Sequence, residues 1–167
     1  MCRYAFLAAM LVALAARAAN AEAPGLGEVR FRFDSSALSW TSRLVLEPVV
    51  TYARAHADAR IVLDAHCDPI GTAPYNVGLA IRRAEAVRDQ LTAMGVPGEQ
   101  IVLAIYGKAG ADRPTYAANR RVTAWATRGP LSDVIARTFE TGGPAVTWEK
   151  PLTTAQIDAA PQPVATR

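Results

Sequence analysis

The stretch Asn76–Met94 reads NVGLAIRRAEAVRDQLTAM, and the spacing of its apolar residues decides the fold. Successive members of the apolar set are separated by four, three, four and three residues, so they form one stripe along an α-helix. Gly95 follows directly and is typical of a helix end. The sequence therefore predicts a long amphipathic helix that packs one face against a core. The stripe consists of Ala80, Ala84, Val87, Leu91 and Met94.

Short segments of β-type pattern lie on both sides of this helix. They alternate apolar with other residues, or are continuously apolar and rich in β-branched residues. A second helical pattern covers about 42–57. The order strand, helix, strand, helix, strand, strand predicts an α+β sandwich of one mixed sheet with two main helices on one face. The expected strands cover 29–33, 61–65, 101–105 and 121–126.

Residues 1–21 have the features of a secretory signal peptide. A basic start at Arg3 precedes the apolar run Ala5–Ala16, and Ala19-Asn20-Ala21 supplies the small residues that a signal peptidase reads. The apolar run is short for a bilayer span, which needs about 20 residues. We therefore expect cleavage before Glu22 and export of the rest of the chain, with an uncleaved anchor as the alternative.

Composition excludes several classes of function. The formal net charge is +3, but Arg3 and Arg17 lie in the first 21 residues and leave 16 basic against 15 acidic residues. A chain whose remaining charge is so close to zero attracts nucleic acid or anionic lipid only weakly. Cys67 is the only cysteine after residue 21, so neither an internal disulfide nor a cysteine-based zinc site is expected. The sequence thus predicts no nucleic-acid partner, no metal and no cofactor.

The segments that flank the predicted domain, residues 28–126, are expected to differ from it. Residues 22–27 contain Pro and Gly and are interpreted as a linker. Residues 127–167 form a C-terminal extension, in which Ser132 is expected to cap a short helix that ends at Gly142-Gly143. A strand fragment is expected at 146–148, and the Pro- and Ala-rich end of the extension is expected to be mobile.

The start of the long helix and the loop before it bring polar side chains together. On a helical wheel Asn76 and Arg83 lie two turns apart on the same side, and the preceding loop contains Asp68 and Gly71. A carboxylate beside a guanidinium suits a zwitterion, because the carboxylate takes an ammonium and the guanidinium takes a carboxylate. The alternative is that Asp68 and Arg83 pair with each other in a purely structural ion pair.

Four segments read RFRFDSS at 30–36, HCDPIG at 66–71, NVGLAIRRAEAV at 76–87 and NRRV at 119–122. In this order and at this spacing they resemble the OmpA-like peptidoglycan-binding domain. The pattern of that family is a strand ending in Phe-Asp, a Gly-His-Thr-Asp-x-x-Gly loop, Asn-x-x-Leu-Ser-x-x-Arg-Ala at a helix start, and Asn-Arg-Arg-Val before the last strand. The resemblance covers residues 28–126 and agrees with the expected fold.

This resemblance implies noncovalent binding of the diaminopimelate residue in the peptide stem of peptidoglycan. Asp68 would receive the ammonium of its free end and Arg83 the carboxylate. Asn76 would add a hydrogen bond, and Ser36 together with amides around Gly71 would line the cleft. A lysine stem lacks the carboxylate, so binding it would leave Arg83 unpaired.

Other positions affect what the resemblance implies about the cleft. Arg120 and Arg121 point to opposite faces of a strand; one is expected to pair with an acid, and Arg121 is taken as the one that approaches the cleft. Ala65, Cys67 and Ala80 stand where the family has Gly, Thr and Ser, which alters the expected shape of the cleft.

The dipeptide His66-Cys67 raises the alternative of a thiol hydrolase. Neighbouring residues on an extended segment point to opposite faces, so they do not form a nucleophile–base pair, and we expect no enzyme. The expected function is peptidoglycan binding in the periplasm of a diderm bacterium, linked to the outer membrane through a protein partner. No membrane-spanning segment is expected after removal of the signal. The alternative is a periplasmic protein-interaction adaptor of the same fold that has lost wall binding.

Overall fold

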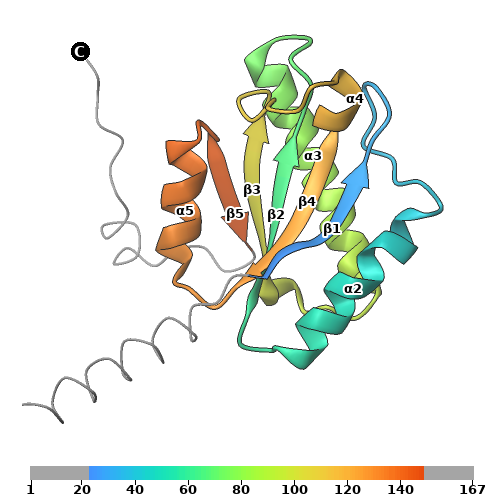
Figure 1. Ribbon diagram of the computed structural model, residues 1–167, viewed down its shortest axis with the longest axis vertical. Coiled ribbons are helices and arrows are strands. Elements are labelled where there is room, and N and C mark those ends of the chain that lie inside the picture. Colours follow the sequence, from blue (N-terminus) through green and yellow to red (C-terminus); the bar gives the residue numbers. More distant parts are fainter. Residues whose placement is uncertain (1–22, 149–167) are drawn as a thin grey trace, which may run out of the picture.

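The computed structural model describes residues 23–148, which form one five-stranded mixed sheet with helices on both faces (Figure 1). The strand order is β1-β4-β2-β3-β5. Strands β2 and β3 run parallel, and every other neighbouring pair is antiparallel. The strands are β1 (Ala23–Arg30), β2 (Arg60–His66), β3 (Ile101–Gly107), β4 (Arg121–Thr127) and β5 (Ala145–Trp148).

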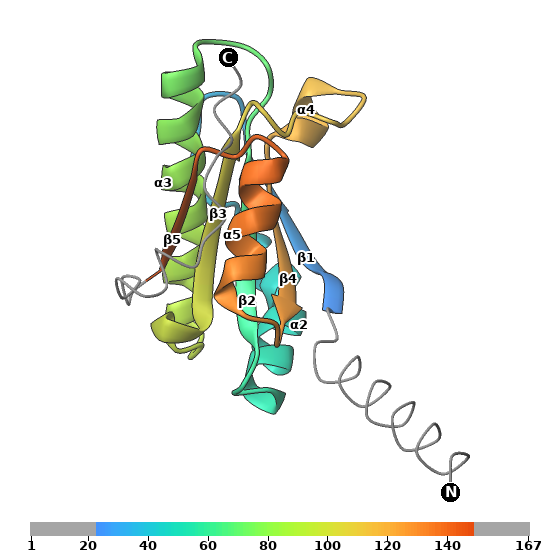
Figure 2. The ribbon, with the colours of Figure 1, turned by 90° about the vertical axis from the view of Figure 1, so that its left-hand side faces the viewer.

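Two long helices cover one face of the sheet and a third helix covers the other, so that α3 and α5 lie on opposite sides of it (Figure 2). The predicted α+β fold, with a mixed sheet and two main helices on one face, is confirmed. The helices are α2 (Ser42–Ala55), α3 (Ala73–Ala93), the short α4 (Tyr116–Asn119), α5 (Leu131–Glu140) and a 3₁₀ turn at Gly98–Gln100.

The alternation of side chains along the central strands creates two cores. On β2, Ile61 and Leu63 point toward α2 and α3, whereas Val62 points toward α5. The stripe predicted on the long helix is buried in the larger core, and Gly95 ends α3 with a φ of +94°. A sheet buried on both faces agrees with the nearly continuous apolar runs of β2 and β3.

The linker expected at 22–27 is wrong from Ala23 onward, because these residues belong to β1 and pair with β4. The register of the β1–β4 pairing shifts between Ala23 and Gly27, so the Pro- and Gly-containing segment forms an irregular strand rather than a free connection. A Cβ on Gly27 would lie 3.0 Å from the carbonyl oxygen of Val45, so the missing side chain lets β1 approach α2. The predicted signal peptide, residues 1–21, lies outside the described residues.

The C-terminal extension contains the two expected elements, but they are part of the folded unit. Helix α5 packs on the sheet through Leu131, Val134 and Ile135, and β5 adds an edge strand to β3. Ser132 does not cap the helix, since Pro130 occupies the N-cap position. Residues 149–167, on which the expected mobility falls, lie outside the described residues.

Gly143→Ala is expected to destabilise the protein by about 1–3 kcal/mol. The new Cβ would lie 2.6 Å from Thr138 Cγ2 and 2.8 Å from the backbone oxygen of Ile105, so the turn between α5 and β5 would have to move away from β3. Urea denaturation measures the effect. Gly78→Ala is the control, because its Cβ would meet only the flexible end of Arg82, at 3.5 Å. Equal stability of wild type and Gly143→Ala would contradict this close packing.

Candidate functional site

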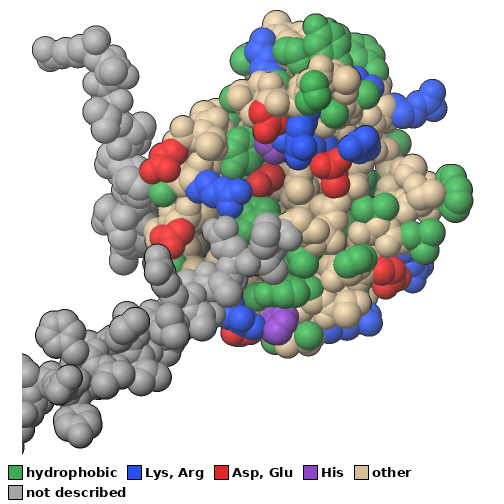
Figure 3. Space-filling view, viewed as in Figure 1, with side chains coloured by type: hydrophobic (Ala, Val, Ile, Leu, Met, Phe, Trp, Pro, Cys, Tyr) green, Lys and Arg blue, Asp and Glu red, His purple; other side chains and the backbone are tan. Residues whose placement is uncertain are grey.

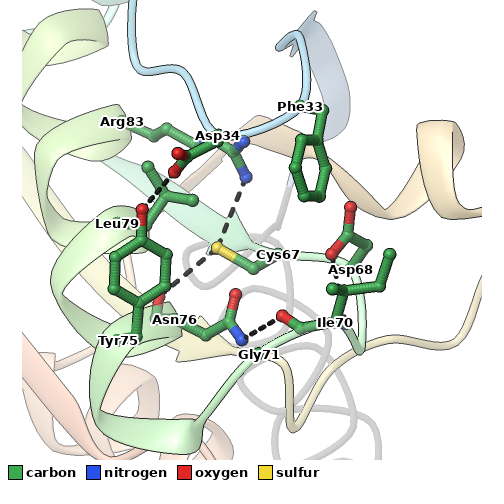
Figure 4. Close-up of a pocket in the computed structure, with 10 residues that line it drawn as sticks. All are labelled: Phe33, Asp34, Cys67, Asp68, Ile70, Gly71, Tyr75, Asn76, Leu79 and Arg83. Carbon is green, nitrogen blue, oxygen red and sulfur yellow. Dashed lines mark hydrogen bonds between the residues drawn. The ribbon is translucent and has the colours of Figure 1, made fainter.

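A pocket of about 150 Å³ opens between the loop after β1, the loop after β2 and the first turns of α3 (Figure 4). Its inner wall carries buried polar side chains, and its mouth carries exposed apolar ones. The structure therefore brings the predicted loop and the predicted helix face together at one site. The lining residues are Phe33, Asp34, Cys67, Asp68, Ile70, Gly71, Tyr75, Asn76, Leu79 and Arg83.

Arg83 is fully buried and is held by backbone oxygens from two other segments. Its Nε donates to the carbonyl of Ser35 at 2.9 Å, and its Nη2 donates to the carbonyl of Arg32 at 3.1 Å. Its Nη1 donates to the carbonyl of His66 and to Cys67 Sγ, both at 3.3 Å. Burial lowers the pKa of Arg83 from its usual value, but a guanidinium surrounded by acceptors stays charged. These four contacts fix its orientation.

Asp68 is also buried, with 4% of its surface exposed. Its Oδ1 accepts from the amide of Ile70 at 3.2 Å, and its Oδ2 accepts from Arg120 Nη1 at 3.2 Å. The ion-pair partner of Asp68 within residues 23–148 is thus Arg120, and the alternative of a closed Asp68–Arg83 pair is not observed. Arg120 is itself held by the carbonyl of Phe31, which accepts from its Nε at 3.2 Å.

Asn76 and Gly71 shape the loop that carries Asp68. Both hydrogens of the Asn76 amide are used inside the loop, because Nδ2 donates to the carbonyls of Ile70 at 2.8 Å and Thr72 at 3.1 Å. Gly71 has a φ of +91°, a conformation that favours glycine. Lys108 Nζ donates to its carbonyl at 2.9 Å. Asn76 therefore positions the loop with its amide nitrogen.

His66 and Cys67 point to opposite faces of the sheet, as the sequence predicts. The Cys67 thiol is buried at the pocket, where it donates to the carbonyl of Asn76 at 3.3 Å, and burial raises its pKa. The His66 ring lies on the α5 side and stacks on Tyr106 with ring centroids 4.7 Å apart. The two side chains do not form a nucleophile–base pair.

Two of the predicted site residues lie away from the pocket wall. Ser36 is half-buried, and it is the carbonyl of the preceding residue, Ser35, that reaches Arg83. Arg121 lies on the α5 side of the sheet, where it lines a different cavity of about 470 Å³ and pairs with Asp112 at 2.8 Å. Figure 3 shows the face of the molecule on which α5 lies, where positively and negatively charged side chains gather close together.

Arg120, and not Arg121, is the arginine of this pair that contacts the pocket residue Asp68. The alternation of side chains along β4 indicates which of the two arginines lies on the pocket side of the sheet. Val122 and Ala124 face α2 and α3, so a residue at the same parity, Arg120, points to the same side.

Sequence reasoning missed four residues at the mouth, which are Phe33, Asp34, Ile70 and Tyr75. Phe33 comes from the loop after β1, and Tyr75 comes from the first turn of α3. The Tyr75 hydroxyl donates to the carboxylate of Asp34, which has a φ of +51°. Phe33 and Asp34 lie within the family motif, but no spacing in the sequence places them opposite a tyrosine 41 residues further on.

Among the described helices, none is both long enough and apolar enough to cross a membrane.

Comparisons with known proteins agree with this architecture. The model of the OmpA family matches residues 30–124. The peptidoglycan-associated lipoprotein of Legionella pneumophila is 35% identical over 97 residues, which are 55% of this chain and 55% of that protein. The crystal structure of the peptidoglycan-associated lipoprotein from Burkholderia pseudomallei is 32% identical with a TM-score of 0.53, covering 60% of this chain and 89% of that one.

A more distant structure shares the fold alone. The periplasmic domain of Helicobacter pylori MotB is 18% identical with a TM-score of 0.54, covering 74% of this chain and 83% of that one. The chain spans just over half the length of the first curated relatives that it matches. The family model covers more than half of the chain, and its motifs form the pocket described above. The chain therefore belongs to the OmpA family.

Proposed function

We propose that this protein binds peptidoglycan noncovalently, through the diaminopimelate residue of the peptide stem, and so links parts of the cell envelope. The observation that carries the proposal is that the Asp68 carboxylate and the Arg83 guanidinium line one pocket without pairing with each other. The names of the relatives, peptidoglycan-associated lipoproteins, support peptidoglycan as the ligand.

The positions of the charged groups in the pocket favour a guest with both an ammonium and a carboxylate. The charged residues that line it are Asp34, Asp68 and Arg83, and Asp68 and Arg83 are buried on the inner wall. The free end of diaminopimelate adds an ammonium for Asp68 and a carboxylate for Arg83. A lysine side chain brings only the ammonium and offers no carboxylate to the Arg83 guanidinium.

Arg83 is arranged in advance for this role. Its contacts with described residues use four of its five N–H donors, which leaves one Nη2 hydrogen for a guest. A guanidinium already held by four acceptors loses little side-chain entropy when a carboxylate arrives. The buried wall also strengthens a charge-assisted hydrogen bond relative to one in water.

The proposed role is non-catalytic and periplasmic. The only thiol of the pocket, Cys67, is buried and its pKa is raised, which makes it a poor nucleophile. In this proposal the domain holds the wall, and a protein of the outer membrane or the periplasm connects it to the rest of the envelope.

Asp68→Asn is expected to reduce sedimentation of the protein with diaminopimelate-type sacculi at least tenfold, because an amide does not neutralise an ammonium. Asp112→Asn is the matched control, since this carboxylate pairs with Arg121 on the other side of the sheet. The measurement is the fraction of protein that co-sediments with sacculi of the diaminopimelate type and of the lysine type.

Retention on diaminopimelate-type sacculi by wild type and Asp112→Asn, but not by Asp68→Asn, supports the proposal. Equal retention on both types of sacculus would contradict the selectivity for diaminopimelate. If the wild-type protein stays in the supernatant with both, the adaptor function replaces wall binding.

A further inference from the structure

The mouth of the pocket is apolar, although its inner wall is polar. Phe33, Tyr75 and Ile70 surround the opening and expose 60%, 48% and 46% of their surface. Large apolar side chains gathered at the entrance of a pocket are typical of a surface that a ligand covers. The ion-pairing proposed above involves none of these three side chains.

Figure 4 shows how the three side chains are arranged. Phe33 and Tyr75 lie on opposite sides of the opening, and Ile70 lies on the loop between them. The hydrogen bond from the Tyr75 hydroxyl to Asp34 joins the first turn of α3 to the loop that carries Phe33. The two segments that carry the aromatic side chains are therefore joined at the mouth.

We propose that Phe33, Ile70 and Tyr75 form an apolar collar that contacts the methylene chain of the bound amino acid. This inference rests on the proposed function. The inner wall binds the zwitterionic head group. The collar contacts the alkyl chain that connects this head group to the rest of the stem peptide. The collar makes the pocket selective for chain length as well as for charge.

The exposure of the lining residues agrees with this division. Asp68, Asn76 and Arg83 on the inner wall are buried, whereas the three collar residues are exposed. In this proposal the chain of the guest leaves the pocket through the collar, and its methylene groups are removed from water there. Burial of methylene groups is favourable and roughly additive, so affinity rises with the number that the collar covers.

The test is a series of straight-chain amino acids that share one head group: glycine, 2-aminobutyrate, norvaline and norleucine. Each is used to displace the protein from diaminopimelate-type sacculi. For the wild type we expect the inhibition constant to fall about fourfold for each added methylene group. Phe33→Ala is expected to reduce this to less than about twofold, while glycine inhibits both proteins equally.

Two variants separate the collar from other effects. Phe139→Ala removes an exposed phenylalanine of α5, on the other face of the sheet, and is expected to keep the wild-type dependence on chain length. Tyr75→Phe keeps the ring but removes the hydrogen bond to Asp34, and it is also expected to keep most of the dependence.

The failures of the two proposals are distinguishable. If the wild type binds sacculi but all four amino acids inhibit equally, or none inhibits, the collar is wrong and wall binding stands. Equal weakening of every inhibitor by Phe33→Ala, glycine included, also overturns the collar. If the wild type does not bind sacculi at all, the proposed function fails first.

Discussion

Arg83→Ala is expected to abolish retention on sacculi and to lower the free energy of unfolding by about 3–5 kcal/mol. The large stability effect follows from the position of the guanidinium, which is fully buried and donates to the backbone oxygens of Arg32, Ser35 and His66. Removing it leaves these acceptors without their donor and opens a cavity beside the core. In the proposed function Arg83 therefore combines a binding role with a structural one.

Urea denaturation and sacculus sedimentation measure the two effects separately. Arg82→Ala is the matched control, because this neighbouring arginine is exposed and its loss is expected to change stability by less than about 0.5 kcal/mol. Arg83→Lys keeps the charge but not the planar fork, so it is expected to recover only part of the stability. An Arg83→Ala protein as stable as the wild type would show that the three carbonyls do not depend on the guanidinium.

Acidification from pH 7 to pH 4 is expected to cost the wild-type protein about 3 kcal/mol through His66 alone. Burial, with a smaller contribution from the charge of Arg121, lowers the pKa of His66 from 6.5 to about 4. Between these two values the unfolded chain binds a proton that the folded protein does not. The stability from this group is therefore fully present above pH 6.5 and is lost as the pH falls toward 4.

The measurement is the free energy of unfolding as a function of pH for the wild type and for His66→Gln. The variant has lower stability at pH 7, because it loses the stacking on Tyr106, but its loss between pH 6.5 and pH 4 is expected to be smaller by about 3 kcal/mol. His56→Gln, at the end of α2, is the control for removal of an imidazole. If the free energies of unfolding of the wild type and His66→Gln changed with pH in parallel, the lowered pKa of His66 would be contradicted.

The fold could be predicted because its signals are local. The 3.6-residue period of α3 and the short β-type runs depend only on neighbouring residues, and their order along the chain restricts the topology to very few possibilities. The motifs also placed Asp68 and Arg83 at one pocket, because a loop and the helix that follows it stay close in space. The prediction of a linker was wrong for the opposite reason: Gly27 belongs to a strand because it pairs with Ala124 of β4, which is far along the chain.

The sequence by itself thus determined the order of the main helices and strands, and it brought Asp68 and Arg83 to one pocket. Only the tertiary structure decided what those charged groups contact. Arg83 finds its acceptors in Arg32 and Ser35, 51 and 48 residues away, and Asp68 finds Arg120, 52 residues away. Such contacts depend on how separate segments pack together. The alternation of β4 indicates the face of the sheet on which Arg120 lies, but no local period or spacing identifies its partner.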